Sequence, residues 1–352
     1  MDKFFLQSDI EEILIRLGDQ VHGFAGKNIL LTGGRGFLGR YFIEVFNSIS
    51  VNILKEPLRL IVLDNLVASG EEGRKIPKYN NIKFLQHDVI NSFNYPLKFD
   101  YIIHAAGIAS PFYYKKMPLK TLDVAISGTR NMLELAEINK SRFSFFSSSE
   151  IYGDPDPNQI PIKESYRGNV SCQGPRACYD ESKRVGETLC DIFYKYKGLS
   201  TNTIRPFNIY GPGMQEKDYR VLPNFASRIK SGKPLNVYGT GNQTRTFCYI
   251  TDAMVGFLLV ILKGKSGEAY NIGNNKPEIS MLDLVKTIEN IYPEEIVYKK
   301  IDYPDSYPED EPTRRMPDIS KANKDLDFYP QVNLEEGLKR FFDWSERNYK
   351  GA

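Results

Sequence analysis

Asn28-Ile-Leu-Leu-Thr32, followed by Gly33-Gly-Arg-Gly-Phe-Leu-Gly39, is the stretch that decides the fold. The apolar run predicts a buried strand, and the apolar periodicity over residues 37–48 predicts the helix that follows it. Gly33 permits a tight turn, Gly36 lets the backbone approach a pyrophosphate, and Gly39 lets helix and strand pack closely. Free N–H groups at the helix start, around Phe37 and Leu38, would bind the phosphates of a dinucleotide.

Short apolar strands and amphipathic helices alternate along the next part of the chain. Further strands are expected over residues 60–64, 82–85, 101–104, 143–147 and 201–205, and further helices over residues 119–138 and 179–196. Strands separated by helices predict crossover connections and therefore an α/β fold with a doubly wound parallel sheet of Rossmann type. We expect a helical extension over residues 1–26, a Rossmann domain over 27–206, and mostly a smaller substrate-binding lobe over 207–352, from which some segments return to the Rossmann domain.

The composition is that of an ordinary globular protein. Of the 352 residues 41% are hydrophobic, and 46 Lys and Arg against 44 Asp and Glu leave a net charge of +2. Nothing in this balance favours a nucleic-acid or membrane partner. The chain starts without the apolar core of a signal peptide, and no window approaches the roughly 18 apolar residues of a membrane span. Four cysteines without Cys-x-x-Cys spacing and three histidines make a metal site unexpected and favour reduced thiols in the cytoplasm.

Carboxylates close the next two expected strands. Asp64, followed by Asn65, can accept hydrogen bonds from the adenosine ribose and would repel a 2′-phosphate, so NAD is expected in preference to NADP. Asp88 and Val89 would lie near the adenine, although a surface acid beside a core valine is nearly as good an interpretation. Ala105, directly after the strand 101–104, completes the expected cofactor site.

Tyr179 and Lys183 lie about one turn apart on one face of an expected helix. A lysine ammonium beside a phenol lowers its pKa, so a phenolate could take a proton from a sugar hydroxyl while hydride leaves to the nicotinamide. Tyr79 and Lys83 share this spacing but lead into a strand, where positions four apart are roughly 13 Å apart. Ser147-Ser148-Ser149-Glu150 ends the strand expected to face the nicotinamide, and a hydroxyl there can bridge the phenol and the substrate.

Together these motifs resemble the extended short-chain dehydrogenases that act on nucleotide sugars, the NAD-dependent epimerase/dehydratase family. The resemblance runs from about Lys27 to the C-terminus. Within that family the chain is most similar to the UDP-glucuronate decarboxylases (UDP-xylose synthases). Four strings carry this likeness: Ser149-Glu-Ile-Tyr-Gly-Asp-Pro155, Gly174-Pro-Arg-Ala-Cys-Tyr-Asp-Glu181, Val237-Tyr-Gly-Thr-Gly-Asn-Gln-Thr-Arg245 and Arg314-Arg-Met-Pro-Asp318. The resemblance implies bound NAD, a UDP-linked sugar as substrate, and a homodimer in which the helices 119–138 and 179–196 form a four-helix interface.

The family logic is oxidation of the sugar at carbon 4, chemistry on the 4-keto sugar, and return of the hydride. A 4,6-dehydratase of this family has an Asp directly before the Glu, where this chain has Ser149. A 4-epimerase of the galactose type has no carboxylate at the position of Glu150. The resemblance therefore favours decarboxylation of UDP-glucuronate to UDP-xylose, which needs no acid for a leaving group. A 4,6-dehydratase, a 4-epimerase and a non-catalytic NAD-binding sensor or scaffold stay open as alternatives.

The resemblance also implies roles for residues of the second half. Arg315 would hold the carboxylate or the protonation machinery, and Glu150 would steer the carboxylate or a water. Arg245 would clamp the diphosphate, for which a guanidinium fork is well suited. Asn208 would bind the diphosphate or the sugar, and Tyr238 could stack on the base. The expected substrate site is completed by Ser110 and Arg220.

Each of these roles has a plainer alternative, namely a helix cap or an ion-pair partner for Glu150, a solvated loop for Arg315, a surface arginine for Arg245 and a core aromatic for Tyr238. One position departs from the resembled family. Many members carry an Asn in the helix before Gly128-Thr129, where this chain has Ala125. That Asn helps to shape the helix near the active site.

Overall fold

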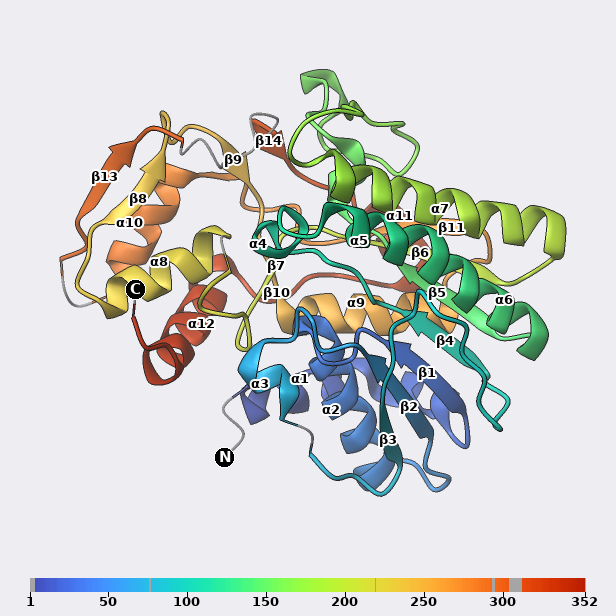
Figure 1. Ribbon diagram of the computed structural model, residues 1–352. Helices are drawn as coiled ribbons and strands as arrows, with labels where there is room; N and C mark the ends of the chain where they lie inside the picture. The colour runs from blue at the N-terminus through green and yellow to red at the C-terminus, as the bar shows by residue number, and fades with distance from the viewer. Residues whose placement is uncertain (1–3, 76, 219, 293–294, 304–311, 352) are drawn as a thin grey trace.

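A seven-stranded parallel sheet forms the centre of the computed structural model, which describes residues 4–75, 77–218, 220–292, 295–303 and 312–351 (Figure 1). Its strands are β1 (Asn28–Thr32), β2 (Arg59–Asp64), β3 (Ile82–Gln86), β4 (Tyr101–His104), β5 (Arg142–Phe146), β6 (Thr201–Pro206) and β11 (Glu268–Ile272), in the order β11-β6-β5-β4-β1-β2-β3. The order reverses between β1 and β4, and doubly wound sheets bind their ligands at the carboxyl ends of strands beside such a reversal. The Rossmann-type fold expected from the sequence is confirmed.

The apolar runs form the sheet because both of its faces are covered. β1 pairs in parallel with β2, with Leu30 opposite Ile61, and with β4, with Leu31 opposite Ile103. Ile29, Leu30 and Leu31 are all fully buried, as in a strand with helices on both sides.

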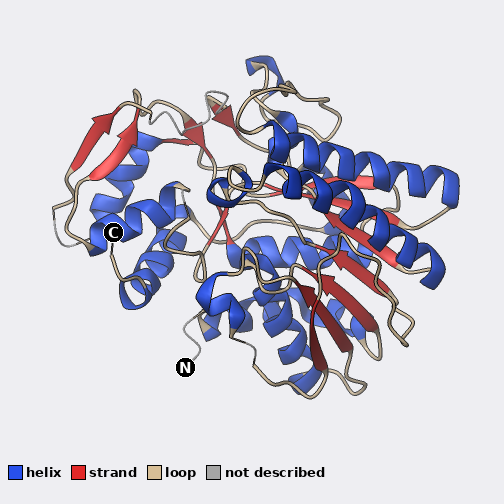
Figure 2. Cartoon of the chain, in the orientation of Figure 1, coloured by secondary structure: helices blue, strands red, loops and turns tan. Residues whose placement is uncertain are grey.

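Helices cover the two faces of the sheet (Figure 2). On one face lie α2 (Phe37–Asn52) and α9 (Ile250–Lys263), and on the other α6 (Thr129–Asn139) and α7 (Ala177–Lys197). The single helix expected over 119–138 is instead α5 (Pro118–Asp123), a π-helical turn (Val124–Gly128) and then α6. At this turn a Cβ on Gly128 would come 2.8 Å from the side chain of Val89, so the helix passes very close to the segment that follows β3.

The second half of the chain contributes β11 to the main sheet and the helices α9 and α11 beside it, and the rest of it builds the lobe at the edge of the sheet. The lobe contains two two-stranded sheets, β10–β7 and β13–β8, and a three-stranded sheet in the order β12-β9-β14. Its strands are β7 (Ile209–Tyr210), β8 (Leu235–Tyr238), β9 (Thr244–Arg245), β10 (Cys248–Tyr249), β12 (Ile279–Ser280), β13 (Tyr298–Ile301) and β14 (Arg314–Arg315). Its helices are α8 (Val221–Lys230), α10 (Met281–Ile291) and α12 (Leu334–Asn348), while α11 (Ser320–Leu326) packs on α9 and β11.

Residues ahead of β1 form α1 (Gln7–Leu17) and a 3₁₀ helix (Gly18–Phe24). α1 packs on α2 and α9, and its apolar face, with Ile10 and Ile13 fully buried, belongs to the main core. Its polar groups reach the lobe, because the buried carboxylate of Asp9 accepts a hydrogen bond of 2.9 Å from the hydroxyl of Tyr249. The extension is therefore an integral part of both halves of the fold.

Short helices complete the structure: α3 (Gly70–Arg74), α4 (Pro111–Tyr114) and the 3₁₀ turns Ser149–Tyr152 and Pro157–Gln159. No helix in the described part of the chain has the length and apolarity needed to cross a membrane.

Candidate active site

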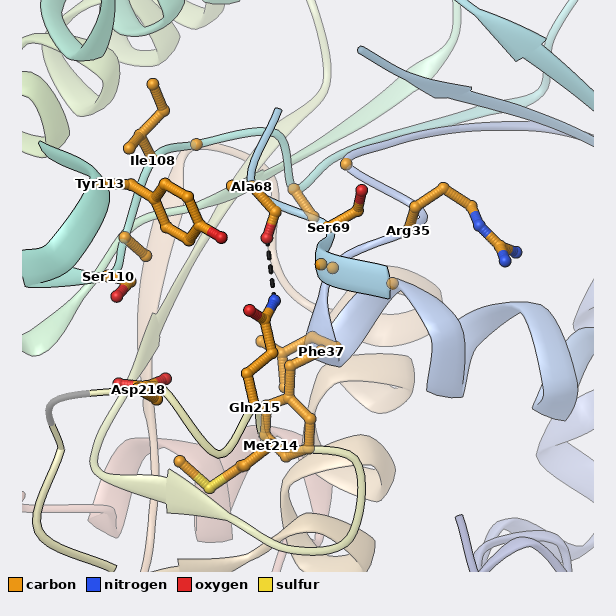
Figure 3. A pocket seen from close by; sticks show the side chains of 18 of the residues that line it. Arg35, Phe37, Ala68, Ser69, Ile108, Ser110, Tyr113, Met214, Gln215 and Asp218 are labelled. Atoms are coloured by element: carbon orange, nitrogen blue, oxygen red, sulfur yellow. Dashed lines mark hydrogen bonds between the residues drawn. The ribbon is translucent and has the colours of Figure 1, made fainter. Parts of the chain in front are cut away.

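A cavity of about 810 Å³ opens at the carboxyl edge of the sheet and is bounded on its other side by the lobe (Figure 3). Every residue predicted to bind the cofactor lines it except Asp88. All the predicted catalytic residues line it except Arg315. Among the predicted substrate residues, Ser110, Asn208 and Arg220 line the cavity, whereas Tyr238 and Arg245 do not. Segments far apart in the sequence thus meet where the reversed strand order places a ligand.

The turn between β1 and α2 has the shape of a phosphate cradle. Gly33 has a φ of +70°, and a Cβ there would come 2.7 Å from the carbonyl oxygen of Ala105. A Cβ on Gly39 would lie 2.3 Å from the carbonyl oxygen of Gly33. α2 begins after Gly36 without a side-chain cap among the described residues, so its first N–H groups are available to an anion. These residues fit the pyrophosphate of a dinucleotide.

Asp64 is fixed at the cavity wall by two backbone N–H groups. Arg35 N donates to Oδ2 at 2.8 Å and Leu66 N donates to Oδ1 at 2.7 Å. Burial raises the pKa of this carboxyl, and the two hydrogen bonds oppose that rise. The guanidinium of Arg35 is turned away onto the carbonyl of Gly73, to which Nε donates at 2.6 Å. A carboxylate therefore faces the position where a ribose would bind.

Asp88 does not line the cavity but contacts Asn65, which does. It accepts a hydrogen bond of 3.0 Å from Asn65 Nδ2 and forms an ion pair of 3.0 Å with Lys120. Burial alone would raise the pKa of Asp88, but these two partners outweigh it and lower the pKa. The neighbouring Val89 lines the cavity and Asp88 does not, so of this pair only the valine could contact a bound cofactor, and the acid holds the amide of Asn65.

Tyr179 and Lys183 project from the first turns of α7 toward the end of β5. Lys183 Nζ donates to the carbonyl of Phe146 at 2.8 Å. The same Nζ lies so close to Gly107 that a Cβ on this glycine would be only 2.9 Å from it. The ring of Tyr179 stacks on that of Tyr114 with centroids 5.4 Å apart, and its hydroxyl is hydrogen-bonded to Ser148. Tyr79, with the same spacing to Lys83, instead donates to Glu44 at 2.7 Å and does not line the cavity.

The electrostatics of this pair differ from the expectation. Burial raises the pKa of Tyr179 to about 12, although the hydrogen bond with Ser148 lowers it. Burial also lowers the pKa of Lys183 to about 8. In the protein itself, desolvation therefore outweighs any activation of the phenol by the lysine. The oxidised nicotinamide is a cation and would favour the phenolate when bound.

Glu150 follows β5 in the turn Ser149–Tyr152 and is held by two arginines from distant segments. Arg315 on β14 makes a bidentate contact, with Nη2 2.7 Å from Oε2, and the Nη2 of Arg176 bonds the same Oε2. Burial would raise the pKa of Glu150, but Arg176 and Arg315 outweigh it and lower the pKa to about 2. The two arginines thus favour the ionised form of Glu150, and Arg315 is committed to this contact and does not line the cavity.

The remaining predicted substrate residues fall into two groups. The first group lines the cavity. Arg220 forms an ion pair with Asp218, Asn208 Nδ2 donates to the carbonyl of Thr246 at 2.8 Å, and Ser110 precedes α4.

The second group, Tyr238 and Arg245, lies away from the lining. Tyr238 stacks on Tyr303 with ring centroids 5.6 Å apart. Arg245 lies opposite Arg315 in the β9–β14 register, donates to the carbonyl of Thr244 at 2.8 Å, and its charge also lowers the pKa of Glu150.

Arg176 and Asp180 are site residues to which the sequence had given no role. Arg176 Nε lies 3.5 Å from Asp180 Oδ2, and burial raises the pKa of Asp180 to about 7, with the Glu150 carboxylate adding to the rise. The available signal was an Arg and an Asp four residues apart at the start of a helix, in the string Gly174–Glu181 already singled out.

Known proteins resemble this chain over most of its length. The model of the NAD dependent epimerase/dehydratase family matches residues 29–273. UDP-glucuronic acid decarboxylase 6 of Arabidopsis thaliana is 37% identical over 311 residues, covering 88% of this chain and 86% of that protein. UDP-glucuronic acid decarboxylase 1 of Xenopus tropicalis is 36% identical over 317 residues, covering 89% and 71%.

Among solved structures, an epimerase from Methanothermobacter thermautotrophicus superposes with a TM-score of 0.77 at 27% identity, covering 97% of this chain and 96% of that one. The glycine cradle, the Tyr–Lys pair and these matches lead to one conclusion. The chain belongs to the NAD-dependent epimerase/dehydratase family and is an enzyme with NAD as its cofactor.

Proposed function

We propose that this enzyme decarboxylates UDP-glucuronate to UDP-xylose. The likeness to UDP-glucuronic acid decarboxylases supports the substrate, and one observation in the site supports the reaction. Glu150, the carboxylate beside the Tyr–Lys pair, is held ionised by Arg176 and Arg315. A 4,6-dehydratase must protonate a departing hydroxyl, and a carboxyl with a pKa of about 2 is a poor proton donor near neutral pH. Ser149 offers no acid either.

In this proposal Tyr179 takes the proton of the sugar's 4-hydroxyl, with Ser148 hydrogen-bonded to both the phenol and the substrate. When bound, the cofactor would supply the acceptor for the hydride of carbon 4 and, in its reduced form, the donor that gives the hydride back. The 4-ketone makes the sugar a β-keto acid, so the bond between carbons 5 and 6 breaks, carbon dioxide leaves, and its bonding electrons pass into an enolate. Carbon 5 takes a proton from water in place of the lost carboxylate. Return of the hydride to carbon 4 and of the proton held by Tyr179 to its oxygen then restores the 4-hydroxyl.

The arginines make this chemistry compatible with an acidic substrate. A lone buried carboxylate at Glu150 would repel the substrate's carboxylate, but two guanidinium groups compensate its charge. Ser110, Asn208 and Arg220 lie on the cavity wall and would bind the sugar and the diphosphate. Glu150 can then steer the carboxylate or a water through its ionised oxygens.

The test is to incubate the purified enzyme with UDP-glucuronate and NAD⁺ and to identify the products by mass spectrometry. We expect carbon dioxide and a UDP-pentose without accumulation of NADH, because hydride is removed and returned in one cavity. A dehydrated 4-keto-6-deoxy product from a UDP-hexose, with UDP-glucuronate untouched, would contradict the proposal in favour of a dehydratase.

We propose in addition that the enzyme is a homodimer. Large apolar side chains are exposed on the outer faces of α5 to α7, namely Leu119, Ile126, Ile138, Ile192 and Tyr196. Burying such side chains against a second copy would be favourable. Light scattering should give twice the chain mass at micromolar concentration, and a monomer would reject the dimer.

Because all four cysteines are free, we place the enzyme in a reducing compartment, the cytoplasm.

A further inference from the structure

Residues 211–218, which we call the strap, connect β7 to the start of α8 and run along the lobe side of the cavity. Gly213, Met214 and Gln215 of the strap line the cavity, and Figure 3 shows Met214 and Gln215 beside Phe37, with Ala68 facing the amide of Gln215. Through Gln215 the strap reaches Ala68 in the loop after Asp64, so this part of it borders the cofactor end. Asp218, at the other end of the strap, pairs with Arg220, whose charge acts on Tyr179.

The strap is bonded across the cavity to the Rossmann side. Gln215 Nε2 donates to the carbonyl of Ala68 at 2.9 Å, joining residues 147 positions apart, and Figure 3 shows this bond. The contact is close, because a Cβ on the neighbouring Gly70 would lie 3.0 Å from the amide of Gln215. The loop after β2, which follows Asp64, is thereby tied to the lobe.

Three aromatic residues from other parts of the chain hold the strap in place. The hydroxyl of Tyr41 on α2 donates to the carbonyl of Pro212 at 3.0 Å, and the hydroxyl of Tyr349, after α12, donates to the carbonyl of Met214 at 2.9 Å. Phe4 packs so closely on Gly213, whose φ is +93°, that a Cβ there would lie 2.5 Å from the ring.

Phe4 belongs to the extension ahead of β1, outside the residues 29–273 that match the family model. It lines the cavity, its ring is 5.9 Å from that of Tyr41, and the guanidinium of Arg40 lies 3.1 Å above it. The extension therefore reaches the rim of the cofactor end and supports the strap there.

We propose that the strap is a clasp over NAD, closed by Gln215 and supported by Phe4 of the N-terminal extension. In this proposal NAD passes between the two segments that the bond from Gln215 to Ala68 joins, so the bond breaks both when NAD enters and when it leaves. A clasp of this kind slows association and dissociation together, whereas a residue that only contacts NAD slows dissociation alone.

The test measures both rate constants for NAD⁺ with the full-length enzyme, by rapid filtration of radiolabelled NAD⁺ and its chase with unlabelled NAD⁺. Gln215→Ala should raise the association and the dissociation rate constants each about fivefold, as expected from the loss of one hydrogen bond. Phe4→Ala should raise both in the same direction but less. The double variant should fall short of the product of the two effects, because both residues act on one element.

Matched controls are Gln159→Ala, at an exposed glutamine outside the cavity lining, and Ile15→Ala, on the exposed face of α1. Both should leave the two rate constants unchanged, and melting curves check that each variant is folded. If Gln215→Ala raises only the dissociation rate constant, Gln215 is an ordinary contact of NAD and the clasp is wrong. Unchanged rate constants in a folded Gln215→Ala variant would overturn it as well.

Discussion

The two ends of the cavity are built in different ways. The cofactor end comes mainly from one continuous strand, turn and helix, in which the glycines and the N–H groups of the backbone form the binding surface. The catalytic end is assembled from side chains of three distant segments: Glu150 after β5, Arg176 before α7 and Arg315 on β14. Arg315 and Glu150 alone are separated by 165 positions in the sequence.

This difference teaches where single substitutions should matter most. A backbone cradle shares its hydrogen bonds among many N–H groups, so the loss of one side chain beside it costs little binding. A charge cluster depends on each member, because removing one partner leaves the other buried and uncompensated. The largest effects are therefore expected at the catalytic end.

Tyr179→Phe should have the largest effect. It removes only the hydroxyl that exchanges the proton, and loss of such a group costs about 10²–10⁴ in rate. Turnover of UDP-glucuronate should fall by this factor while NAD affinity and the melting temperature stay unchanged. Tyr79→Phe is the matched control, because Tyr79 has the same spacing to a lysine but lies outside the cavity lining. Normal turnover by the Tyr179 variant would show that the Tyr–Lys mechanism is wrong.

Arg315→Ala should come next. It leaves Glu150 with Arg176 as its remaining direct guanidinium partner, which should lower the free energy of unfolding by up to about 3 kcal/mol. We expect kcat to fall about 10- to 100-fold, equivalent to about 1.4–2.7 kcal/mol in activation free energy. The affinity for UDP itself should change little, because Arg315 contacts Glu150 and does not line the cavity.

The adjacent Arg314 provides the control for this variant. It is partly exposed and pairs with Glu278, so Arg314→Ala should leave both kcat and UDP affinity nearly unchanged. Arg315→Lys keeps the charge but loses the bidentate contact. Compared with Arg315→Ala, it should therefore recover more of the lost free energy of unfolding than of the lost kcat. Equal losses from Arg314→Ala and Arg315→Ala would mean that the whole strand β14, not the contact with Glu150, is what turnover requires.

The fold was predictable because its signals are local. Each strand of the main sheet up to β6 was placed within one or two residues, since apolar runs bounded by turns mark buried strands, and Gly33 to Gly39 need no distant partner. The π-helical turn before α6 was missed because apolar periodicity does not separate it from the α-helix on either side. The return of β11 to the main sheet was foreseen only in general terms.

The catalytic end was less predictable for a physical reason. Neither spacing nor periodicity links Arg315 to Glu150, and only resemblance pointed to both. Their bidentate contact turned an expected substrate ligand into a partner of Glu150. The pKa of Tyr179 was misjudged in the same way, because the desolvation that raises it depends on a packed surrounding that no local motif encodes.

Asp64→Ala should have a moderate effect, confined to the choice of cofactor. The wild type should bind NAD more tightly than NADP, because Asp64 would repel a 2′-phosphate, and the variant should narrow that preference about tenfold, measured by calorimetry with both cofactors. Asp64→Asn removes the charge and also one of two acceptors, because Arg35 N and Leu66 N donate to different oxygens of Asp64 and an amide has only one oxygen. It should therefore narrow the preference as well, and melting curves should show the loss of one of the two hydrogen bonds. Equal affinities of the wild type for NAD and NADP would contradict the role of Asp64.

Ala125→Asn should have the smallest effect, and it tests whether the departure from the resembled family matters. Ala125 is buried in the π-helical turn, beside Val124, which lines the cavity. The turn forms with alanine in place, so its shape does not depend on an asparagine side chain. We expect kcat to change less than about threefold, or about 0.65 kcal/mol in activation free energy.

The buried amide that Ala125→Asn introduces should lower the free energy of unfolding by about 1–3 kcal/mol unless the amide finds a hydrogen-bond partner. Ala136→Asn, in the regular part of α6, should lose stability in the same way without touching the turn. A tenfold or larger gain in kcat from Ala125→Asn alone would show that the missing amide, and not the Glu150 cluster, limits turnover at the catalytic end.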